Sequence, residues 1–356
     1  MNNIKDKIKQ LKDNGETVYS ISRLNTVDEC GWEYWQTYME HLSGKENIYG
    51  FTGTKVHKCL EDIQNGIEVD FPKEISQMLK DAEFLDITFP SVSIQEKWEK
   101  NMLAFSQNYI PPTYNLVETE KLFLVELNGK YLQGIIDLLI YNEDGTVSIR
   151  DYKTSSKFSN KDLESKGRQL ILYGLAMEQL GYKVKDLAWE MLKYVEISYK
   201  LKNGKTRTTI AERGYVIEKL KNDIIKELKA LDQFTELEIE VLMAKSISNN
   251  SFKYLPESIK DKYTIKDYTC YYDFTEERKN ETKAFIKAKI EDIERHKNTE
   301  EWWEPKEITP YTSFYCENLC NHRSHCKYFQ EYKELQELIN ERTQEIEAEK
   351  ELLKFI

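Results

Sequence analysis

The amino-acid sequence of 356 residues predicts an α/β fold. Residues 116–126, 131–141 and 146–153 are rich in β-branched and aromatic residues, and the short turns LNGK and NEDG separate them. Residues 160–181 then follow a helical pattern, and residues 183–212 predict a second hairpin around the turn KNGK. Strands that are followed by a helix and by further strands are typical of an α/β core.

Helical patterns extend on both sides of this predicted core. Residues 20–65 predict two helices, the first with Ser22 as its expected N-cap, and residues 66–110 predict a helical insertion. Beyond the core, residues 213–305 are expected to be mostly charged helix, and residues 326–354 predict a final, highly charged helix. We therefore expect five consecutive regions: N-terminal helices (1–65), a helical insertion (66–115), the core (116–212), a helical region (213–305) and a C-terminal part (306–356).

The composition argues against a membrane protein and against loose binding to polyanions. The 51 basic and 62 acidic residues give a net charge of −11, which disfavours charge-driven binding to nucleic acid, so any such site must be local. One candidate is the stretch 153–168, where five basic residues outnumber two acidic ones, although a solvated surface gives the same pattern. No apolar run approaches the roughly 20 residues of a membrane span, and the N-terminus lacks an apolar signal core. We therefore expect a soluble, cytoplasmic protein without a membrane partner.

The predicted hairpin GIIDLLIYNEDGTVSIRDYKTS carries charged residues inside its strands. If its turn is centred on Asp144, then Asp137 and Asp151 lie opposite one another, with Cβ atoms about 4.5–5.5 Å apart. Two carboxylates at that distance repel each other unless a cation lies between them. Strand alternation also places Lys153 on the face of Asp151 and turns Tyr152 away. The hairpin therefore predicts a cation site with two carboxylates and one ammonium group.

The oxygen-rich character of this site favours hard divalent cations such as Mg²⁺ or Mn²⁺, which leave coordination positions for a substrate phosphate. Hydrolysis of a phosphodiester suits such a site, because the ion polarises the phosphoryl oxygen and Lys153 can orient a water or stabilise negative charge. Glu120, on the preceding predicted strand, is a further acidic candidate, although a strand glutamate is usually solvated. A surface hairpin with a simple Asp–Lys salt bridge is the alternative interpretation of these residues.

Several segments of the chain together resemble the signature of a known nuclease superfamily. The sequences GIIDLL and IRDYKTS look like the Asp…(Asp/Glu)-x-Lys motif of the PD-(D/E)xK nucleases. The segment GRQLILYGLAM places Gln169 and Tyr173 one helical turn apart and resembles the Gln-x-x-x-Tyr element of the RecB-like branch. The segment GTKVHKCLE, with His57, resembles the Gly-Thr-x-x-His helix of that branch. All of these motifs occur in the family's order and at family-like separations.

This resemblance implies a fold and a set of site residues. The implied fold is a PD-(D/E)xK restriction-endonuclease-like core, a mixed central sheet flanked by helices, with additional helical regions. The implied metal ligands are His57, Asp137, Asp151 and the backbone carbonyl of Tyr152. The implied catalytic residues are Asp137, Asp151, Lys153, Gln169 and Tyr173. Among these, Lys153 is the base or charge stabiliser, and Gln169 and Tyr173 position DNA or the lysine.

The cysteines point to a second metal site. Six cysteines in a long, cytoplasmic-looking chain argue against a disulfide framework. Three of them, Cys316, Cys320 and Cys326, form a compact C-x₃-C-x₅-C array. Such an array needs a fourth ligand to close a tetrahedral thiolate site, and Cys30 is the candidate. Four thiolates serve zinc as well as an iron–sulfur cluster. The segment also offers two imidazoles to zinc, those of His322 and His325.

The segment SISRLNTVDECGWEYW around Cys30 resembles the first ligand helix of RecB-like nucleases that carry a [4Fe-4S] cluster. In that branch, which includes the nuclease domain of the AddB helicase partner and the CRISPR-adaptation nucleases, one cysteine precedes the nuclease motifs and three follow them. Here Gly31 stands where proline is usual, and the first gap of the triplet is one residue longer. The resemblance implies a cluster that staples the N- and C-terminal parts together, with structural Zn²⁺ as the rival. Its implied ligands are Cys30, Cys316, Cys320 and Cys326.

The resemblance also implies a function, namely a metal-dependent DNA nuclease that acts as an exonuclease on DNA ends or single-stranded DNA. Recombination, repair or the processing of phage or mobile-element DNA is the implied context. The sequence has no G-x-x-x-x-G-K-(Ser/Thr) pattern, so unwinding needs a helicase or another DNA-processing partner subunit. The alternative is a non-catalytic DNA-end-binding or scaffold subunit of a helicase–nuclease or CRISPR-adaptation-type complex. The intact Asp137, Asp151 and Lys153 argue against it.

Overall fold

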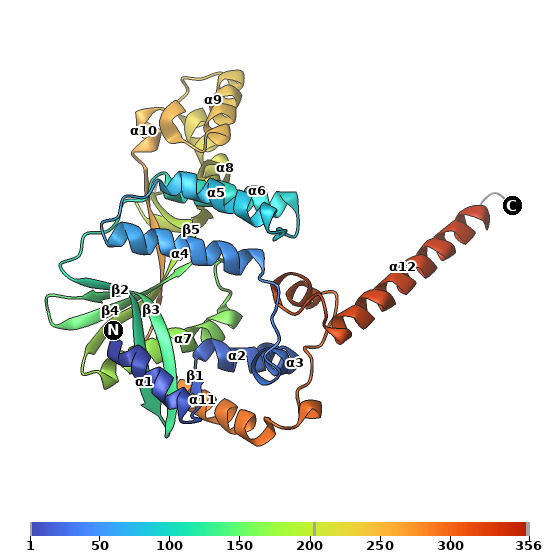
Figure 1. Cartoon of the computed structure of the whole chain (residues 1–356). Coiled ribbons are helices and arrows are strands. Elements are labelled where there is room, and N and C mark those ends of the chain that lie inside the picture. The colour runs from blue at the N-terminus through green and yellow to red at the C-terminus, as the bar shows by residue number, and fades with distance from the viewer. Residues whose placement is uncertain (1, 202–203, 354–356) are drawn as a thin grey trace. The chain divides into compact units, whose positions relative to one another are not determined.

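The computed structural model describes residues 2–201 and 204–353, and the side chains of these residues apart from those of residues 2, 3, 161, 352 and 353. The chain divides into two compact units (Figure 1). The first unit comprises Met1–Tyr19 and Phe51–Lys283, and the second comprises Ser20–Gly50 and Ala284–Ile356. None of the helices in the described ranges combines the length and the apolar character that a membrane span needs.

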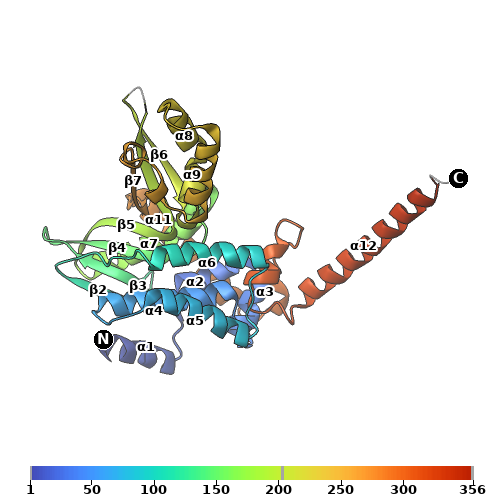
Figure 2. The same cartoon turned by 90° about the horizontal axis from the view of Figure 1, so that it is seen from above.

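In the described part of the first unit, seven strands form one mixed sheet (Figures 1 and 2). The strands are β1 (Val18–Tyr19), β2 (Val117–Leu127), β3 (Lys130–Tyr141), β4 (Thr146–Lys153), β5 (Lys183–Lys200), β6 (Thr206–Glu212) and β7 (Tyr263–Tyr272). Their order is β1-β3-β4-β5-β6, with β2 also paired to β3 and β7 also paired to β5. The predicted α/β fold with a mixed sheet is therefore confirmed.

The centre of the sheet is an antiparallel meander followed by a parallel crossover. Strands β2, β3 and β4 pair antiparallel in sequence order, and β5 then joins β4 in parallel. Helix α7 (Asn160–Gln179) makes the crossover that parallel neighbours require. The core beneath is dry, since Ile136, Ile149 and Leu172 have no exposed surface. All of these elements lie within two residues of their predicted boundaries.

Helices precede and follow the meander. Helix α1 (Asn2–Asp13) comes first, and α4 (Ile48–Gln64), α5 (Phe71–Phe84) and α6 (Val92–Ser106) lead into β2. Helices α8 (Val216–Ala230), α9 (Glu236–Ser248) and α10 (Glu257–Lys260) connect β6 to β7, and α11 (Glu276–His296) follows β7. In the view of Figure 1, α4 lies above the strands of the meander and α7 below them. The helical insertion predicted for residues 66–110 is thus formed by α5 and α6.

Strand β7 lies inside the region 213–305 that the charge pattern predicted to be mostly helical. Most of its side chains are exposed or half-buried, so the sequence lacks the apolar alternation that marks a strand with one buried face. The strand forms because its backbone pairs with β5 from Leu187 to Tyr199, around an irregularity between Glu190 and Val195. A partner distant in sequence therefore decides its conformation.

The second unit is built from α2 (Ile21–Glu29), α3 (Gly31–Tyr34) and α12 (Lys327–Leu353), with π-helical turns at Trp35–Met39 and Tyr315–Leu319. The expected N-cap at Ser22 is wrong, because α2 begins earlier and the hydroxyl of Ser20 accepts the hydrogen bond from the backbone N–H of Arg23. The predicted final helix is α12, and Lys354 lies outside the described residues. Three aliphatic side chains of α12, those of Leu335, Leu338 and Ile339, are about half exposed.

Candidate active site and cysteine site

The catalytic hairpin has the register that its turn predicts. The pairs Leu138↔Arg150, Leu139↔Ile149, Ile140↔Ser148 and Tyr141↔Val147 all follow the rule that centres the turn on Asp144. Asp137 and Asp151 are the next two residues along this register, just beyond the last pair of the ladder. The backbone N–H of Tyr152 donates to Asp137 Oδ2 at 2.7 Å, which ties the two strands together where the regular ladder ends.

The imidazole of His57, on α4, reaches the same place from a distant part of the sequence. Its Nδ1 lies 3.5 Å from Asp137 Oδ2, and its Nε2 lies 3.0 Å from the carbonyl oxygen of Tyr152. Burial acts to lower the pKa of His57, but the Asp137 carboxylate outweighs burial and the pKa is raised. The ring therefore bridges the Asp137 side chain and the Tyr152 backbone, two of the groups that the sequence predicted as metal ligands.

Glu120 is a further member of the site. It interrupts β2 between the pairs Thr119↔Leu138 and Lys121↔Ile136, which bracket Glu120 and Asp137 as neighbours. Its φ of 48° is left-handed, a conformation that costs on the order of 1–3 kcal/mol in a residue with a side chain. Burial, and then the Asp137 charge, raise the pKa of Glu120. The LNGK turn carries the same kind of signal as NEDG: residues at equal distances on either side of it pair, and Glu120 and Asp137 are such residues.

These side chains fit a divalent cation. The potential ligand atoms of His57, Glu120 and Asp137 all lie within 4.8 Å of one another. Around one octahedral ion with bonds of about 2.1 Å, adjacent ligands lie about 3 Å apart and opposite ligands about 4.2 Å apart, so ion binding is expected to draw these atoms closer together. Two carboxylates and one imidazole suit Mg²⁺ or Mn²⁺, and the carbonyl oxygen of Tyr152 offers a fourth ligand atom beside His57.

Asp151 and Lys153 form a buried ion pair next to this set. Asp151 is 1% exposed, and its Oδ2 lies 2.6 Å from Lys153 Nζ. Burial raises the pKa of Asp151 to about 6, while the Lys153 ammonium opposes the shift and Asp137 adds to it. Burial acts to lower the pKa of Lys153, but the Asp151 carboxylate more than offsets it, so the pKa is raised. The lysine is therefore a cation held beside two carboxylates.

Helix α7 fixes the position of that lysine. Lys153 Nζ donates to Gln169 Oε1 at 3.3 Å, and Gln169 Nε2 donates to the hydroxyl of Tyr173 at 2.7 Å. The ring of Tyr173 packs edge-on against Phe123 of β2, with ring centroids 5.7 Å apart. The Gln-x-x-x-Tyr pair thus orients the ammonium group through one chain of hydrogen bonds, which is the lysine-positioning alternative of the sequence interpretation.

The basic stretch 153–168 does not form one uniform surface. Lys157 and Lys166 are exposed, whereas the ammonium of Lys153 is occupied by Asp151. The side chain of Lys161 lies outside the described residues. The stretch therefore contributes one half-buried site residue, Lys153, an exposed lysine before α7, Lys157, and one on α7, Lys166.

All four cysteines of the predicted second site line one small enclosed cavity in the second unit. Cys30, Cys316 and Cys326 pack with Trp32 and Phe329 in an apolar cluster. Each of the four cysteines is at most 9% exposed. The backbone N–H of Lys306 donates to Cys30 Sγ at 3.3 Å, the kind of hydrogen bond that stabilises a metal-bound thiolate. The four cysteines converge from the junction of α2 and α3, the π-helical turn at Tyr315–Leu319, the residue after that turn and the residue before α12.

The ionisation of these thiols depends on a bound cation. Burial raises the pKa of Cys30 and Cys320, and burial together with the neighbouring Cys30 raises the pKa of Cys316 to about 11. Neutral thiols are poor ligands, whereas a metal centre deprotonates and binds them. Four convergent thiols in a closed apolar cavity therefore fit a thiolate-bound metal centre.

His322 and His325, the two histidines near the cysteine triplet, make hydrogen bonds with other groups. His322 shares one hydrogen bond with the hydroxyl of Thr37, at 2.8 Å from Nε2, and another with His325, at 3.0 Å from Nδ1. His322 is 1% exposed, so both of its nitrogens are satisfied in the interior. These contacts favour a site of four sulfurs over the mixed site that the sequence left open.

The glycine after Cys30 has a steric cause. A Cβ at Gly31 would lie 2.8 Å from the carbonyl oxygen and 3.2 Å from the nitrogen of Glu304, both backbone atoms. That approach is needed because the N–H of Trp32 donates to the same carbonyl at 3.1 Å. The departure from the usual proline therefore reflects close backbone packing beside the cysteines.

We expect the variant Glu120→Gln to weaken Mn²⁺ binding by roughly 10- to 100-fold, because the change removes one of two ligand charges while keeping the side-chain shape. Isothermal titration of the full chain with Mn²⁺ measures this. The matched control is Glu118→Gln on the same strand, since Glu118 pairs with Lys121 and Tyr141 instead. Equal Mn²⁺ affinity in both variants would remove Glu120 from the site.

We expect Gly31→Ala to lower the free energy of unfolding by about 1–3 kcal/mol, because backbone atoms of Glu304 must move to admit the methyl group. Thermal and urea unfolding provide the measurement. Gly50→Ala is the control, since a Cβ there meets nothing closer than 3.6 Å in a helix that favours alanine. A Gly31→Ala protein as stable as the control would show that this contact adapts without cost.

Comparison with known proteins gives one extensive match. The sequence model of the PD-(D/E)XK nuclease superfamily matches residues 18–327. No curated protein matches the chain. Among solved structures, the chain is similar to the one titled "Crystal structure of SSO0001", with 16% identity, coverage of 45% of this chain and 77% of that chain, and a TM-score of 0.21, which is too low to support a conclusion. Because the superfamily match covers most of the chain and every residue of the candidate active site, the protein belongs to the PD-(D/E)XK nuclease superfamily.

Proposed function

We propose that the protein is a Mg²⁺- or Mn²⁺-dependent deoxyribonuclease that acts as an exonuclease on DNA ends or single-stranded DNA. Membership in the superfamily supports a metal-dependent nuclease. The observation that carries the proposal is the convergence of His57, Glu120 and Asp137 beside the buried Asp151–Lys153 pair. A surface hairpin held by a simple salt bridge would not explain why a strained glutamate and a histidine lie at the same point.

The residues take distinct roles in this proposal. His57, Glu120 and Asp137 hold the divalent ion, with Asp151 and the carbonyl oxygen of Tyr152 on its border. The bound ion supplies Lewis acidity toward the scissile phosphate and lowers the pKa of a coordinated water. Lys153 orients the attacking water or stabilises negative charge on the phosphate, and its ammonium is kept in place by Asp151 and Gln169. Tyr173 holds Gln169.

DNA is the proposed substrate because the chain, although acidic overall, offers local cations and aromatic rings that can contact DNA. The exposed Lys157 and Lys166 follow the catalytic strand directly and can hold backbone phosphates. We further propose a role in recombination, repair or mobile-element DNA processing, with a helicase or similar subunit as partner. This context comes from the resemblance of the motifs to RecB-like nucleases, the nuclease domain of AddB among them.

We also propose that Cys30, Cys316, Cys320 and Cys326 hold a [4Fe-4S] cluster. The four buried thiols around one cavity, the N–H bond to Cys30 and the engaged nitrogens of His322 support a site of four sulfurs. The order of the cysteine motifs along the chain favours the cluster over zinc. The bonds would join the α2–α3 segment to the C-terminal segment of the second unit. Such bonds convert metal affinity into folding stability, so the centre is a structural staple.

Asp151→Asn and Lys153→Met are expected to lower the rate of metal-dependent DNA cleavage by at least about 100-fold, because each removes a charge held at the reacting phosphate. Labelled single-stranded and duplex DNA, incubated with Mn²⁺ or Mg²⁺, give the rates. The controls are Asp144→Asn and Lys185→Met, an exposed pair from the β3–β4 turn and from β5 whose charges lie 3.6 Å apart. Circular dichroism of each variant separates lost chemistry from lost folding.

The same assay distinguishes the scaffold alternative. Tight DNA binding by the wild-type chain, without cleavage in either metal, would support a non-catalytic DNA-end-binding subunit and refute the enzyme. Cleavage that persists unchanged in Asp151→Asn would refute the site.

Removal of the cysteine-bound metal is expected to destabilise the second unit. Anaerobically purified protein should contain about four iron atoms per chain and show broad visible absorption. Each of the four cysteine-to-serine variants at the cavity should lose iron and melt at a lower temperature. The controls are Cys59→Ser and Cys270→Ser, since neither residue lines the cavity. Zinc without iron in the purified protein would show that the four cysteines bind zinc and not an iron–sulfur cluster.

A further inference from the structure

A second pocket lies behind the catalytic hairpin. Side chains alternate along β4, so Arg150 and Tyr152 face away from Asp151 and Lys153. Both line a cavity of about 210 Å³ that is closed from the other side by α6 and the segment after it. Its mouth is at residues 110–114, where Ile110 is 83% exposed. The cavity is therefore distinct from the metal site but shares a strand with it.

The walls of the cavity are aromatic. Five rings line it, those of Phe105, Tyr109, Tyr114, Tyr152 and Tyr268. Phe105 and Tyr109 lie 5.0 Å apart between ring centroids. Burial raises the pKa of Tyr109 to about 12 and also raises the pKa of Tyr114, so both phenols remain neutral hydrogen-bonding groups. Neutral aromatic walls of this kind favour a flat ligand that stacks.

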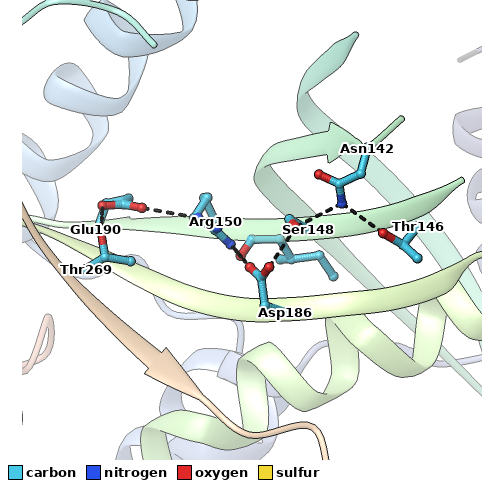
Figure 3. A network of polar contacts seen from close by, with 8 residues as sticks. Asn142, Thr146, Ser148, Arg150, Asp186, Glu190 and Thr269 are labelled. Carbon is cyan, nitrogen blue, oxygen red and sulfur yellow. Dashed lines mark hydrogen bonds and ion pairs between the residues drawn. The ribbon is translucent and has the colours of Figure 1, made fainter. Parts of the chain in front are cut away.

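One edge of the cavity is polar, and Figure 3 shows the network of contacts to which its residues Arg150, Glu190 and Thr269 belong. Arg150 pairs with Asp186 and, through Nε, with Glu190 Oε1 at 3.2 Å. The hydroxyl of Thr269 donates to Glu190 Oε2 at 2.8 Å. Each carboxylate oxygen of Glu190 thus has one donor and keeps a second lone pair for a ligand N–H. Glu190 and Thr269 also occupy paired positions on β5 and β7, which fixes their spacing.

The charges of the cavity select against a phosphate. Its two arginines are already paired, Arg150 with Glu190 and Asp186, and Arg213 with Asp267 at 2.6 Å. The cavity itself is lined by these two arginines and by two carboxylates, Glu190 and Asp267, so no excess positive charge is left for a polyanion. A neutral ligand with N–H donors on one edge matches this balance.

The volume limits the size of the ligand. Pockets for drug-sized molecules occupy about 300–1,000 Å³, whereas this cavity occupies about 210 Å³. It has room for one or two fused rings and excludes a longer molecule. Nucleobases are flat, neutral ring systems with N–H donors along one edge, and proteins bind them by stacking on aromatic side chains and by carboxylate acceptors.

We propose that this cavity binds a single nucleobase, stacked between the tyrosine rings with its amino edge against Glu190 and Thr269. As a site on a nuclease, the proposal rests on the proposed function. Its link to catalysis is Tyr152, whose ring lines the cavity while its backbone N–H and carbonyl contact Asp137 and His57. An occupant therefore touches the residue that joins the two carboxylate strands.

Fluorescence of 2-aminopurine deoxyriboside tests the proposal, because stacking on aromatic rings quenches it. The full chain is titrated with the nucleoside in EDTA, so that no cleavage takes place. Tyr114→Ala is expected to bind at least about ten-fold more weakly than wild type, and Tyr114→Phe to bind nearly as well, since the ring supplies the stacking. Tyr311→Ala is the matched control, because Tyr311 is 95% exposed and lies outside the cavity.

A short single-stranded oligonucleotide that carries 2-aminopurine identifies the source of the base. Quenching of the oligonucleotide that depends on Tyr114 assigns the cavity to a base of the strand, whereas quenching of the nucleoside alone assigns it to a free nucleoside or nucleotide. The absence of quenching with both probes, or equal affinities in Tyr114→Ala and Tyr311→Ala, would overturn the proposal. DNA cleavage without nucleoside binding refutes only the cavity, and nucleoside binding without cleavage refutes only the nuclease.

Discussion

The buried ion pair between Asp151 and Lys153 is the interaction around which the first unit is organised. A carboxylate that is 1% exposed stays next to a second carboxylate, Asp137, only because the ammonium group lies 2.6 Å away. Buried ion pairs are often replaceable by apolar residues without loss of stability, so stability alone does not explain this one. Gln169 and Tyr173 orient the lysine through hydrogen bonds. This arrangement is the one expected if Lys153 acts at a phosphate, as proposed.

The same two strands serve both faces of the sheet. On one face β3 and β4 present carboxylates and an ammonium group, and on the other face β4 presents Arg150 and Tyr152 to an aromatic cavity. Tyr152 belongs to both, through its backbone on one side and its ring on the other. A central strand that is buried on both faces therefore carries residues of the two proposed binding sites next to one another along the chain.

The second unit follows a different physical logic. Its four cysteines are spread over two distant parts of the sequence, and they meet in a cavity that burial makes unfavourable for free thiolates. The metal centre that we propose would remove that cost by binding the thiolates, and the contacts around Cys30 and Gly31 would then form part of its ligand cage. Both π-helical turns of the unit lie beside this cage, one of them carrying Cys316.

Much of the fold was determined by local sequence, since turn chemistry and side-chain period act over a few residues. The turn NEDG fixed the register that brings Asp137 to Asp151, and the apolar patterns of β2, β3, β4 and α7 set their bounds to within two residues. Tertiary structure decided what local period does not encode. Strand β7 forms because it pairs with β5, and His57 reaches Asp137 only because α4 packs near the sheet. The N-cap of α2 is Ser20, whereas the sequence pattern indicates Ser22. Glu120 acquires its strained backbone only between its neighbours in the sheet, because strain is stable where surrounding contacts outweigh it.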